Sequence, residues 1–157
     1  MTPKLVLVLA AASVAAASAA SDLTPPMGYR QWFHVNSLTV DSTSPLFAQL
    51  GGLHNIYVNA KGLPGLQKGG PYADGSVFVD DIHAFTVESG VYSEGSRKAL
   101  TVMVKDAKTY AATGGWGFQL WVGGDAAKPV VTDAATQCVA CHAPHKDHDY
   151  VFSTYIP

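Results

Sequence analysis

The chain has 157 residues, a formal net charge of −2 at pH 7 and a hydrophobic content of 48%. This length is enough for one hydrophobic core and argues against several domains. The charge provides no basic field, which argues against nucleic acid as a partner.

Residues 1–20 have the pattern of a signal peptide. Lys4 provides the positive start, an apolar run extends from Leu5 to Ala17, and Ala17-Ser18-Ala19 is a small-residue cleavage site. We expect cleavage after Ala19 or Ala20, which leaves residues 21–157 as a single domain in the periplasm. The apolar run is short and rich in alanine, and no later segment approaches the length of a membrane span. The sequence therefore predicts no membrane span.

Short alternating apolar segments between glycines and prolines predict an antiparallel sheet with a few short helices. In chain order, we expect a brief helix at 29–33, strands at 53–59, 76–87 and 99–105, a helix at 106–112, a strand at 116–122, a helix through 138–142 and a closing strand at 151–155. Asp106 is expected to cap one helix, and Thr132 or Asp133 the other. Segments 61–75 and 123–133 are expected to be loops. The predicted fold class is α+β with mainly antiparallel sheet.

The most informative motif is Cys138-Val139-Ala140-Cys141-His142, the Cys-x-x-Cys-His pattern of covalent haem attachment. Two thiols on one helical turn can each add to a haem vinyl group, and the adjacent histidine then reaches the iron. A thioredoxin-like dithiol, or a zinc site completed by His145 and His148, has a similar pattern. The chain has only two cysteines and an export signal, which favours one covalently attached haem c with His142 as the proximal ligand.

A sixth iron ligand is expected upstream, because the fifteen residues after His142 include no methionine. The candidates are Met27, Met103, His34, His54 and His83, unless the site stays open. His34, His83, His145 and His148 are expected at the surface. Met103 would give a six-coordinate haem suited to electron transfer with a redox partner protein, whereas core packing is the alternative role for this side chain.

Seven short motifs stand in order along most of the chain. They are Tyr29-Arg30-x-Trp32, Ile56-Tyr57-Val58, Asp74-Gly75-Ser76-Val77, Leu100-x-x-x-Val104-Lys105-Asp106-x-Lys108, Gly115-Trp116-x-Phe118, Cys138-x-x-Cys141-His142 and Asp149-x-Val151-Phe152-x-x-x-x-Pro157. Together they resemble the cytochrome P-460 and cytochrome c′-beta family. The resemblance implies a mainly antiparallel β fold, five-coordinate haem with His142 proximal, a homodimer, and either hydroxylamine oxidation or nitric oxide binding.

The chain departs from the hydroxylamine-oxidising members at three positions. By the resemblance, Asp80 occupies the position of a lysine that those members join covalently to the haem. Thr101 occupies the position of their distal glutamate, and His54 that of a distal arginine. The lysine and the carboxylate base of proton-coupled oxidation are therefore missing. Asp80 or Asp81 is the candidate for a substitute base. Lys68 precedes the expected strand and lies in the expected loop.

The remaining features resemble the cytochrome c′-beta branch, whose apolar, aromatic-capped distal side admits small uncharged molecules. Phe78 is the first candidate for the cap, because strand alternation places it on the face of Ser76 and Asp80. Trp32, Phe33, Tyr57 and Phe85 are further aromatic candidates. The leading interpretation is a protein that binds nitric oxide or a similar small ligand, with enzymatic activity left open. The alternatives are an electron carrier ligated by Met103 and a hydroxylamine oxidoreductase with an altered site.

Overall fold

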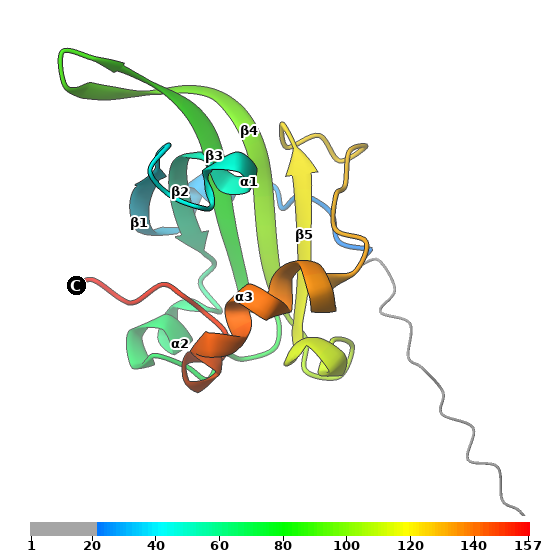
Figure 1. Ribbon diagram of the computed structural model, residues 1–157. Helices are drawn as coiled ribbons and strands as arrows, with labels where there is room; N and C mark the ends of the chain where they lie inside the picture. The colour runs from blue at the N-terminus through cyan, green and yellow to red at the C-terminus, as the bar shows by residue number, and fades with distance from the viewer. Residues whose placement is uncertain (1–21) are drawn as a thin grey trace, which may run out of the picture.

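The computed structural model describes residues 22–157, so the expected signal peptide lies outside the described residues. Its centre is a five-stranded antiparallel sheet in which each strand pairs with the next along the chain (Figure 1). The strands are β1 (Phe33–Val40), β2 (Gly52–Val58), β3 (Val77–Glu88), β4 (Val91–Lys105) and β5 (Trp116–Val122). Short helices connect them, so the α+β prediction is confirmed.

The helices are all short, and none in residues 22–157 is long and apolar enough to cross a membrane. A 3-10 turn at Tyr29–Gln31 precedes the sheet, and α1 (Phe47–Leu50) and α2 (Leu63–Lys68) flank β2. A second 3-10 turn, Ala111–Thr113, precedes β5. The C-terminal helical segment passes through a π-helical turn, Ala135–Val139, then α3 (Ala140–His142) and a 3-10 segment, Ala143–His148, which is kinked at His145.

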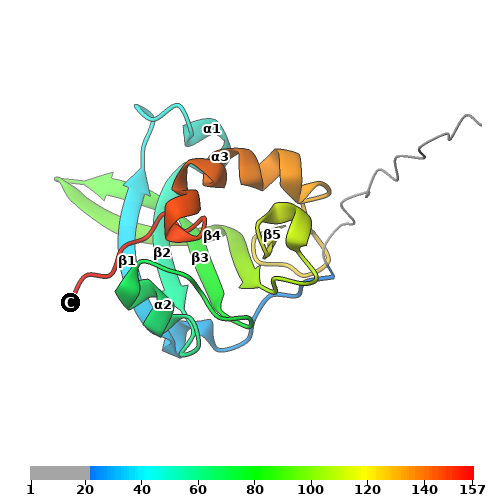
Figure 2. The ribbon, with the colours of Figure 1, turned by 90° about the horizontal axis from the view of Figure 1, so that it is seen from below.

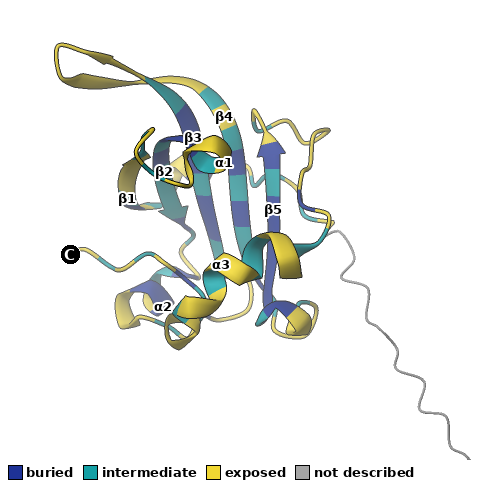
Figure 3. Ribbon diagram, viewed as in Figure 1, coloured by how far each residue is buried: buried dark blue, intermediate teal, exposed yellow. Residues whose placement is uncertain are grey.

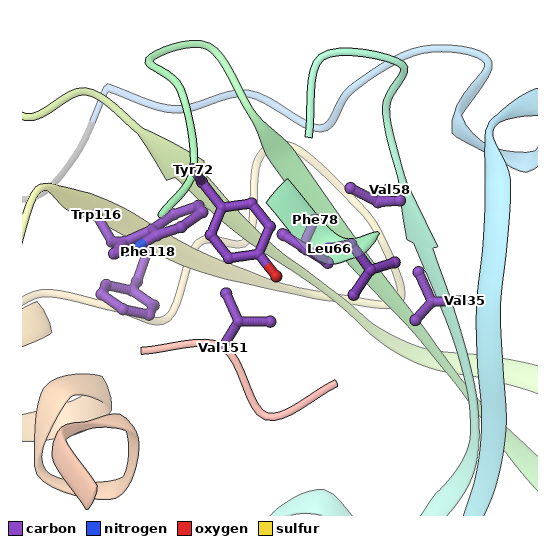
Figure 4. Packing of buried hydrophobic residues seen from close by; sticks show 8 residues of the cluster. All are labelled: Val35, Val58, Leu66, Tyr72, Phe78, Trp116, Phe118 and Val151. Carbon is purple, nitrogen blue, oxygen red and sulfur yellow. The ribbon is translucent and has the colours of Figure 1, made fainter. Parts of the chain in front are cut away.

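The two faces of the sheet have separate cores. The C-terminal helical segment lies over one face, and the N-terminal segment around Tyr29 lies under the other (Figure 2). We call the first the helical face. Its buried cluster contains Val35, Val58, Leu66, Tyr72, Phe78, Trp116, Phe118 and Val151 (Figure 4). The cluster of the opposite face contains Tyr29, Val79, Leu100, Val102 and Trp121. Because side chains alternate along a strand, β2 to β5 contribute to both cores, whereas β1 contributes to that of the helical face.

Burial is concentrated in the part of the sheet between these two cores (Figure 3). The far ends of β3 and β4 form a hairpin that projects beyond the other strands and is exposed at its tip. Ser89 and Gly90 make the turn with φ values of 51° and 81°. This hairpin is why β4 begins at Val91 rather than at the predicted residue 99.

Strand predictions at 53–59, 76–87 and 116–122 are confirmed within a residue or so, but three other segments differ. Segment 61–75 is not all loop, because Pro64 stands in the first turn of α2 and Gly69, with a φ of 75°, ends it. Residues 33–40, for which no strand was predicted, form β1. Segment 151–155 has no regular secondary structure and pairs with none of the strands in residues 22–157, so the predicted closing strand is wrong.

The two predicted caps are present, but only one begins the helix expected. Asp133 Oδ1 accepts the N–H of Ala135 at 3.0 Å at the start of the C-terminal helical segment. Asp106 Oδ1 accepts the N–H of Thr109 at 2.9 Å, yet a turn follows and the helix is limited to Ala111–Thr113. Side-chain oxygens satisfy the first free N–H groups at both places.

Candidate functional site

The Cys-x-x-Cys-His motif lies where the C-terminal helical segment approaches the sheet. Gln137 Oε1 accepts the N–H groups of Thr132 and Asp133, both at 2.8 Å, and so fixes the start of the segment. Cys138 is half-buried and packs against the core of the helical face, whereas Cys141 is exposed. Both thiols are free and lie three positions apart on one helical turn, as attachment of one flat group requires.

The environment of the thiols argues against the two alternatives to haem. Burial, with a contribution from Cys141, raises the pKa of the Cys138 thiol to about 11. A dithiol oxidoreductase needs the opposite shift, because the thiolate is its nucleophile. Within residues 22–157, no three His, Cys, Asp or Glu side chains are grouped as metal ligands. A Cys/His zinc cluster with His145 and His148 is therefore not assembled in this part of the chain.

His142 is oriented as an iron ligand would be. Its Nδ1 lies 2.7 Å from the carbonyl oxygen of Tyr150, and because a carbonyl only accepts, Nδ1 carries the hydrogen. The lone pair is then on Nε2, and the carbonyl fixes this tautomer as partners of metal-ligating histidines commonly do. The rings of Phe118 and Phe152 lie 5.1 and 4.6 Å from the imidazole. Burial lowers the pKa of His142, which favours the neutral form that binds a metal.

The carbonyl that orients His142 belongs to a tightly anchored turn. Asp149 and Tyr150 have φ values of 53° and 67°, and such left-handed conformations persist in these residue types only where neighbours hold them. Asp149 Oδ1 accepts a bond from Lys105 Nζ at 2.6 Å, and its carbonyl accepts Trp116 Nε1 at 2.8 Å. The latch of Lys105, Asp149 and Trp116 thus joins the sheet to the turn behind His142.

Sequence reasoning missed this latch, although its members stand within the quoted motifs. Lys105 belongs to the fourth motif, Trp116 to the fifth and Asp149 to the last. Each was used only as a mark of resemblance. The signal available was a lysine in a strand with strong alternation, where a buried cation needs a carboxylate partner.

We expect Asp149→Ala to lower the free energy of unfolding by about 3–5 kcal/mol, because it leaves the Lys105 ammonium buried without its partner. The side chains of Lys105 and Asp149 are only 10% and 15% exposed. Asp125→Ala is the matched control, since its pair with Lys128 is 45% and 63% exposed and should contribute less than about 1 kcal/mol. Urea unfolding of both variants measures the difference. Equal losses would contradict the assigned role of the latch.

The register of the sheet places Phe78, Asp80, Thr101 and Met103 on the helical face. Phe78 pairs with Met103, which in turn pairs with Phe118. One row further along the strands, Asp80 pairs with Thr101. His54 lies on the same face of β2, where its neighbour on β3 is Ile82. The four positions predicted to line the haem, together with Met103, therefore lie on the same sheet face as the Cys-x-x-Cys-His motif.

The other candidates for a distal ligand lie elsewhere. Met27 is 92% exposed, and His34 is an exposed residue that bonds Ser37 at 2.9 Å. His83 is not at the surface as predicted, because Nε2 bonds Asp81 at 2.9 Å beneath the opposite face and only 6% of the residue is exposed. Met103 and His54 are the two upstream candidates that remain on the helical face.

Most of the additional aromatic candidates are also displaced from the site. Trp32 and Tyr57 pack against the cluster of the opposite face. Phe85 packs against Tyr92 within the projecting hairpin, with ring centroids 5.5 Å apart. Phe78 is buried on the helical face, against the ring of Tyr72 at 5.2 Å. Phe33 also packs against this cluster, but it is only partly buried and stacks on Tyr155, so Phe78 remains the first candidate for the cap.

Two adjacent aspartates point to opposite faces and have opposite environments. Asp81 is fully buried on the opposite face, where Arg97 Nε bonds it at 2.6 Å and Arg30 Nη2 at 2.7 Å. These hydrogen bonds outweigh burial and hold the pKa of Asp81 well below its usual range. Among residues 22–157, Asp80 has only His54 as a side-chain partner, at 2.8 Å, and burial raises the pKa of Asp80. The hydrogen bonds of Asp81 therefore indicate a structural role. Of the two candidate bases, only Asp80 lies on the helical face.

An antiparallel sheet faced by a Cys-x-x-Cys-His helix, with Nε2 of the histidine available, defines a haem protein of the cytochrome type. The family model described as Cytochrome P460 matches residues 26–153, so the chain belongs to the cytochrome P460 family. Membership implies a haem cofactor. The residues present fit that group, since two free thiols and an oriented imidazole stand on one helical segment. A comparison with curated proteins gives no match.

Proposed function

We propose that this chain is a periplasmic c-type haem protein that binds nitric oxide or a similar small ligand. One haem c would be attached at Cys138 and Cys141, with His142 as the proximal ligand. When bound, the haem supplies an iron with a coordination position for such a molecule. The observation that carries the proposal is the pairing of Asp80 with Thr101 across β3 and β4, because the resemblance implies lysine and glutamate there in enzymes that oxidise hydroxylamine.

The side chains on the helical face support an uncharged ligand. Val58, Phe78, Met103 and Phe118 form one cross-strand row, and Val58, Phe78 and Phe118 are at most 5% exposed. Such a row excludes water and offers no opposite charge to an ion. A small neutral molecule loses little hydration free energy when it enters an apolar site of this kind. In this proposal Phe78 is the residue that limits the space available to the ligand.

Electron transfer through a His/Met-ligated haem is the second candidate, and one observation favours it. Met103 lies on the helical face between Phe78 and Phe118, its two cross-strand partners. A thioether there would raise the potential of the haem if it bound the iron. Packing against aromatic rings is the alternative use of the same side chain. Hydroxylamine oxidation with an altered site is the third candidate and would depend on a base other than the family's glutamate.

We also propose a compartment and partners for this protein. The pattern of Lys4 and the apolar run to Ala17 supports export to the periplasm, where c-type haem is attached. Small nitrogen species, nitric oxide first and hydroxylamine second, are the proposed ligands. A homodimer and a redox partner protein are proposed with them, the homodimer on the basis of the family resemblance.

We expect the reduced protein to show a high-spin, five-coordinate spectrum and to bind nitric oxide without displacing a protein ligand. Met103→Ala should then leave the spectrum unchanged and lower stability by less than the roughly 2–5 kcal/mol typical of a fully buried methionine, because Met103 is only partly buried. Optical spectra measure the spin state, and stopped-flow mixing with nitric oxide measures the rate of ligand binding. Met103→Leu is the control, because it retains volume without a sulfur ligand. A low-spin wild type that both variants convert to high spin would establish the electron carrier instead.

A further inference from the structure

A second chemical feature of the helical face involves two titratable side chains outside the Cys-x-x-Cys-His motif. His54 is only 4% exposed, and its Nδ1 lies 2.8 Å from Asp80 Oδ2. The other carboxylate oxygen, Asp80 Oδ1, is buried and has no hydrogen-bond partner among residues 22–157. A buried carboxylate oxygen without a donor is costly, so such an atom in a native fold requires an explanation.

The hydrogen bonds of His54 determine how many protons the pair contains. Nε2 lies 2.7 Å from the carbonyl oxygen of Leu50, and because that oxygen can only accept, Nε2 must carry a hydrogen. The contact between Nδ1 and Asp80 Oδ2 then requires one more proton, on the imidazole or on the carboxyl group. Without it, two acceptors would face each other at 2.8 Å. The pair therefore holds one shared proton.

This arrangement also limits what His54 can do. Both of its ring nitrogens are engaged, one by the backbone carbonyl of Leu50 and one by Asp80. Ligation of iron by His54 would break one of these bonds inside a buried site. Its observed contacts instead fix the orientation of Asp80 and leave Oδ1 as the unpartnered atom. His54 is thus a positioning residue.

We propose that His54 and Asp80 form a proton-holding pair, and that Asp80 Oδ1 accepts a hydrogen from a ligand bearing N–H or O–H groups. This inference rests on the proposed haem site, and it deepens that proposal by adding a polar recognition element to an otherwise apolar face. If the hydrogen transfers, the ligand's N–H or O–H bond breaks and an O–H bond forms at Oδ1. The electron pair stays on the ligand, and His54 as imidazolium remains beside the neutral carboxyl group.

The electrostatics of the surroundings agree with a retained proton. Burial alone would lower the pKa of His54, but the hydrogen bond and charge of Asp80, with the Leu50 carbonyl, raise it overall. Burial raises the pKa of Asp80, and the bond from His54 opposes this only in part. Lys98 on β4 and Asp81 on β3 are the other charged groups whose fields reach the pair. Asp81 is itself neutralised by Arg30 and Arg97.

The first test follows the proton on His54 directly. Nitrogen NMR of histidine-labelled holoprotein, as the reduced carbon monoxide complex, should show His54 losing a proton at a pH above the ordinary histidine range. Asp80→Asn keeps the shape and can donate its amide hydrogen to Nδ1, so the imidazole should stay neutral and its apparent pKa should fall. If His54 had the same apparent pKa in both proteins, the proposed proton-holding pair would be wrong. If the chain proves to contain no haem, the protein as purified gives the same readout.

The second test separates ligand recognition from a structural role. Hydroxylamine and nitric oxide are titrated into wild type, Asp80→Asn and Asp80→Leu, with the exposed Asp125→Leu as the control for the same chemical change. Loss of a hydrogen bond to a charged group predicts roughly 10- to 100-fold weaker hydroxylamine binding in Asp80→Leu and little change for nitric oxide. Asp80→Asn should retain much of the affinity but lose its pH dependence. Equal weakening of both ligands would mean that Asp80 is only structural and would overturn the proposal.

The two proposals fail in different ways. A protein that binds neither probe, but whose His54 still titrates as described, would refute the proposed function and leave the proton-holding pair intact. If the protein binds nitric oxide but substitution of Asp80 leaves hydroxylamine binding unchanged, the proposed function stands and the role of Asp80 in ligand recognition is refuted. Asp80→Asn makes this comparison possible even if Asp80→Leu does not fold.

Discussion

We expect the double variant Cys138→Ala/Cys141→Ala to retain no covalently bound haem, and each single variant to retain it weakly. Each thiol would supply one thioether bond, so the effect of removing both is all-or-none. The two thiols stand on one helical turn, one half-buried and one exposed, and neither has a disulfide partner. Extraction of the denatured proteins with acidic acetone, followed by mass spectrometry of the polypeptide, measures the attached haem directly.

His142→Ala is the complementary variant for the same experiment. It should leave both thioether bonds in place and remove the proximal ligand, so the protein keeps its added mass while its spectrum changes. His145→Ala provides a matched control, because His145 contacts the same ring, Phe152, at 4.2 Å but is not the motif histidine. Release of haem from the denatured wild type would show that the motif does not attach it covalently.

The positions of the candidate distal residues could be predicted from sequence because strand alternation is simple. Phe78 and Asp80 are two apart on β3, as are Thr101 and Met103 on β4, so each pair must share a face. The buried helical-face core constrains the register further, since a slip of one residue would turn Phe78 out of it. This is why the residues predicted for the site come together even though several elements were missed.

The contacts of these residues could not be predicted in the same way. The bond between His54 and Asp80 depends on the pairing of β2 with β3, in which Ile56 rather than His54 stands opposite Asp80. Their side chains meet along the diagonal, a relation that no local pattern encodes. The bond from His54 to the Leu50 carbonyl also depends on α1, a four-residue helix that the sequence did not reveal.

The wrong assignment of His83 has a similar cause. Histidine is amphipathic and often half-exposed, so a surface position was the reasonable expectation. Its burial follows from Asp81, whose carboxylate also binds Tyr29, Arg30 and Arg97. These partners lie between 16 and 52 positions away in the sequence. Only the fold shows that these residues all bind the buried carboxylate of Asp81.

We expect Asp81→Asn to lower the free energy of unfolding by about 1.5–3 kcal/mol, from a total that is typically about 5–15 kcal/mol, because it weakens the charge-assisted hydrogen bonds to a buried carboxylate. The carboxylate is 0% exposed, whereas the side chains of its partners Arg30 and Arg97 are 48% and 33% exposed and are therefore partly screened by water. Glu94→Gln is the graded control, because Glu94 joins the same network at its rim, 3.4 Å from Arg30 and with a side chain 38% exposed. It should cost less than about 1 kcal/mol.

The same substitution should change the acid sensitivity of the fold. The pKa of Asp81 is lowered in the folded protein, with hydrogen bonds from Arg97, Tyr29 and Arg30 overcoming burial. A lowered folded pKa stabilises the protein at pH values above the ordinary aspartate pKa, and this contribution is lost as the pH falls below it. Urea unfolding of the wild type should therefore show stability declining steeply below about pH 4. Asp81→Asn should be less stable at neutral pH and flatter in this range, because it has no carboxylate to protonate. Parallel profiles for the two proteins would show that Asp81 does not control acid unfolding.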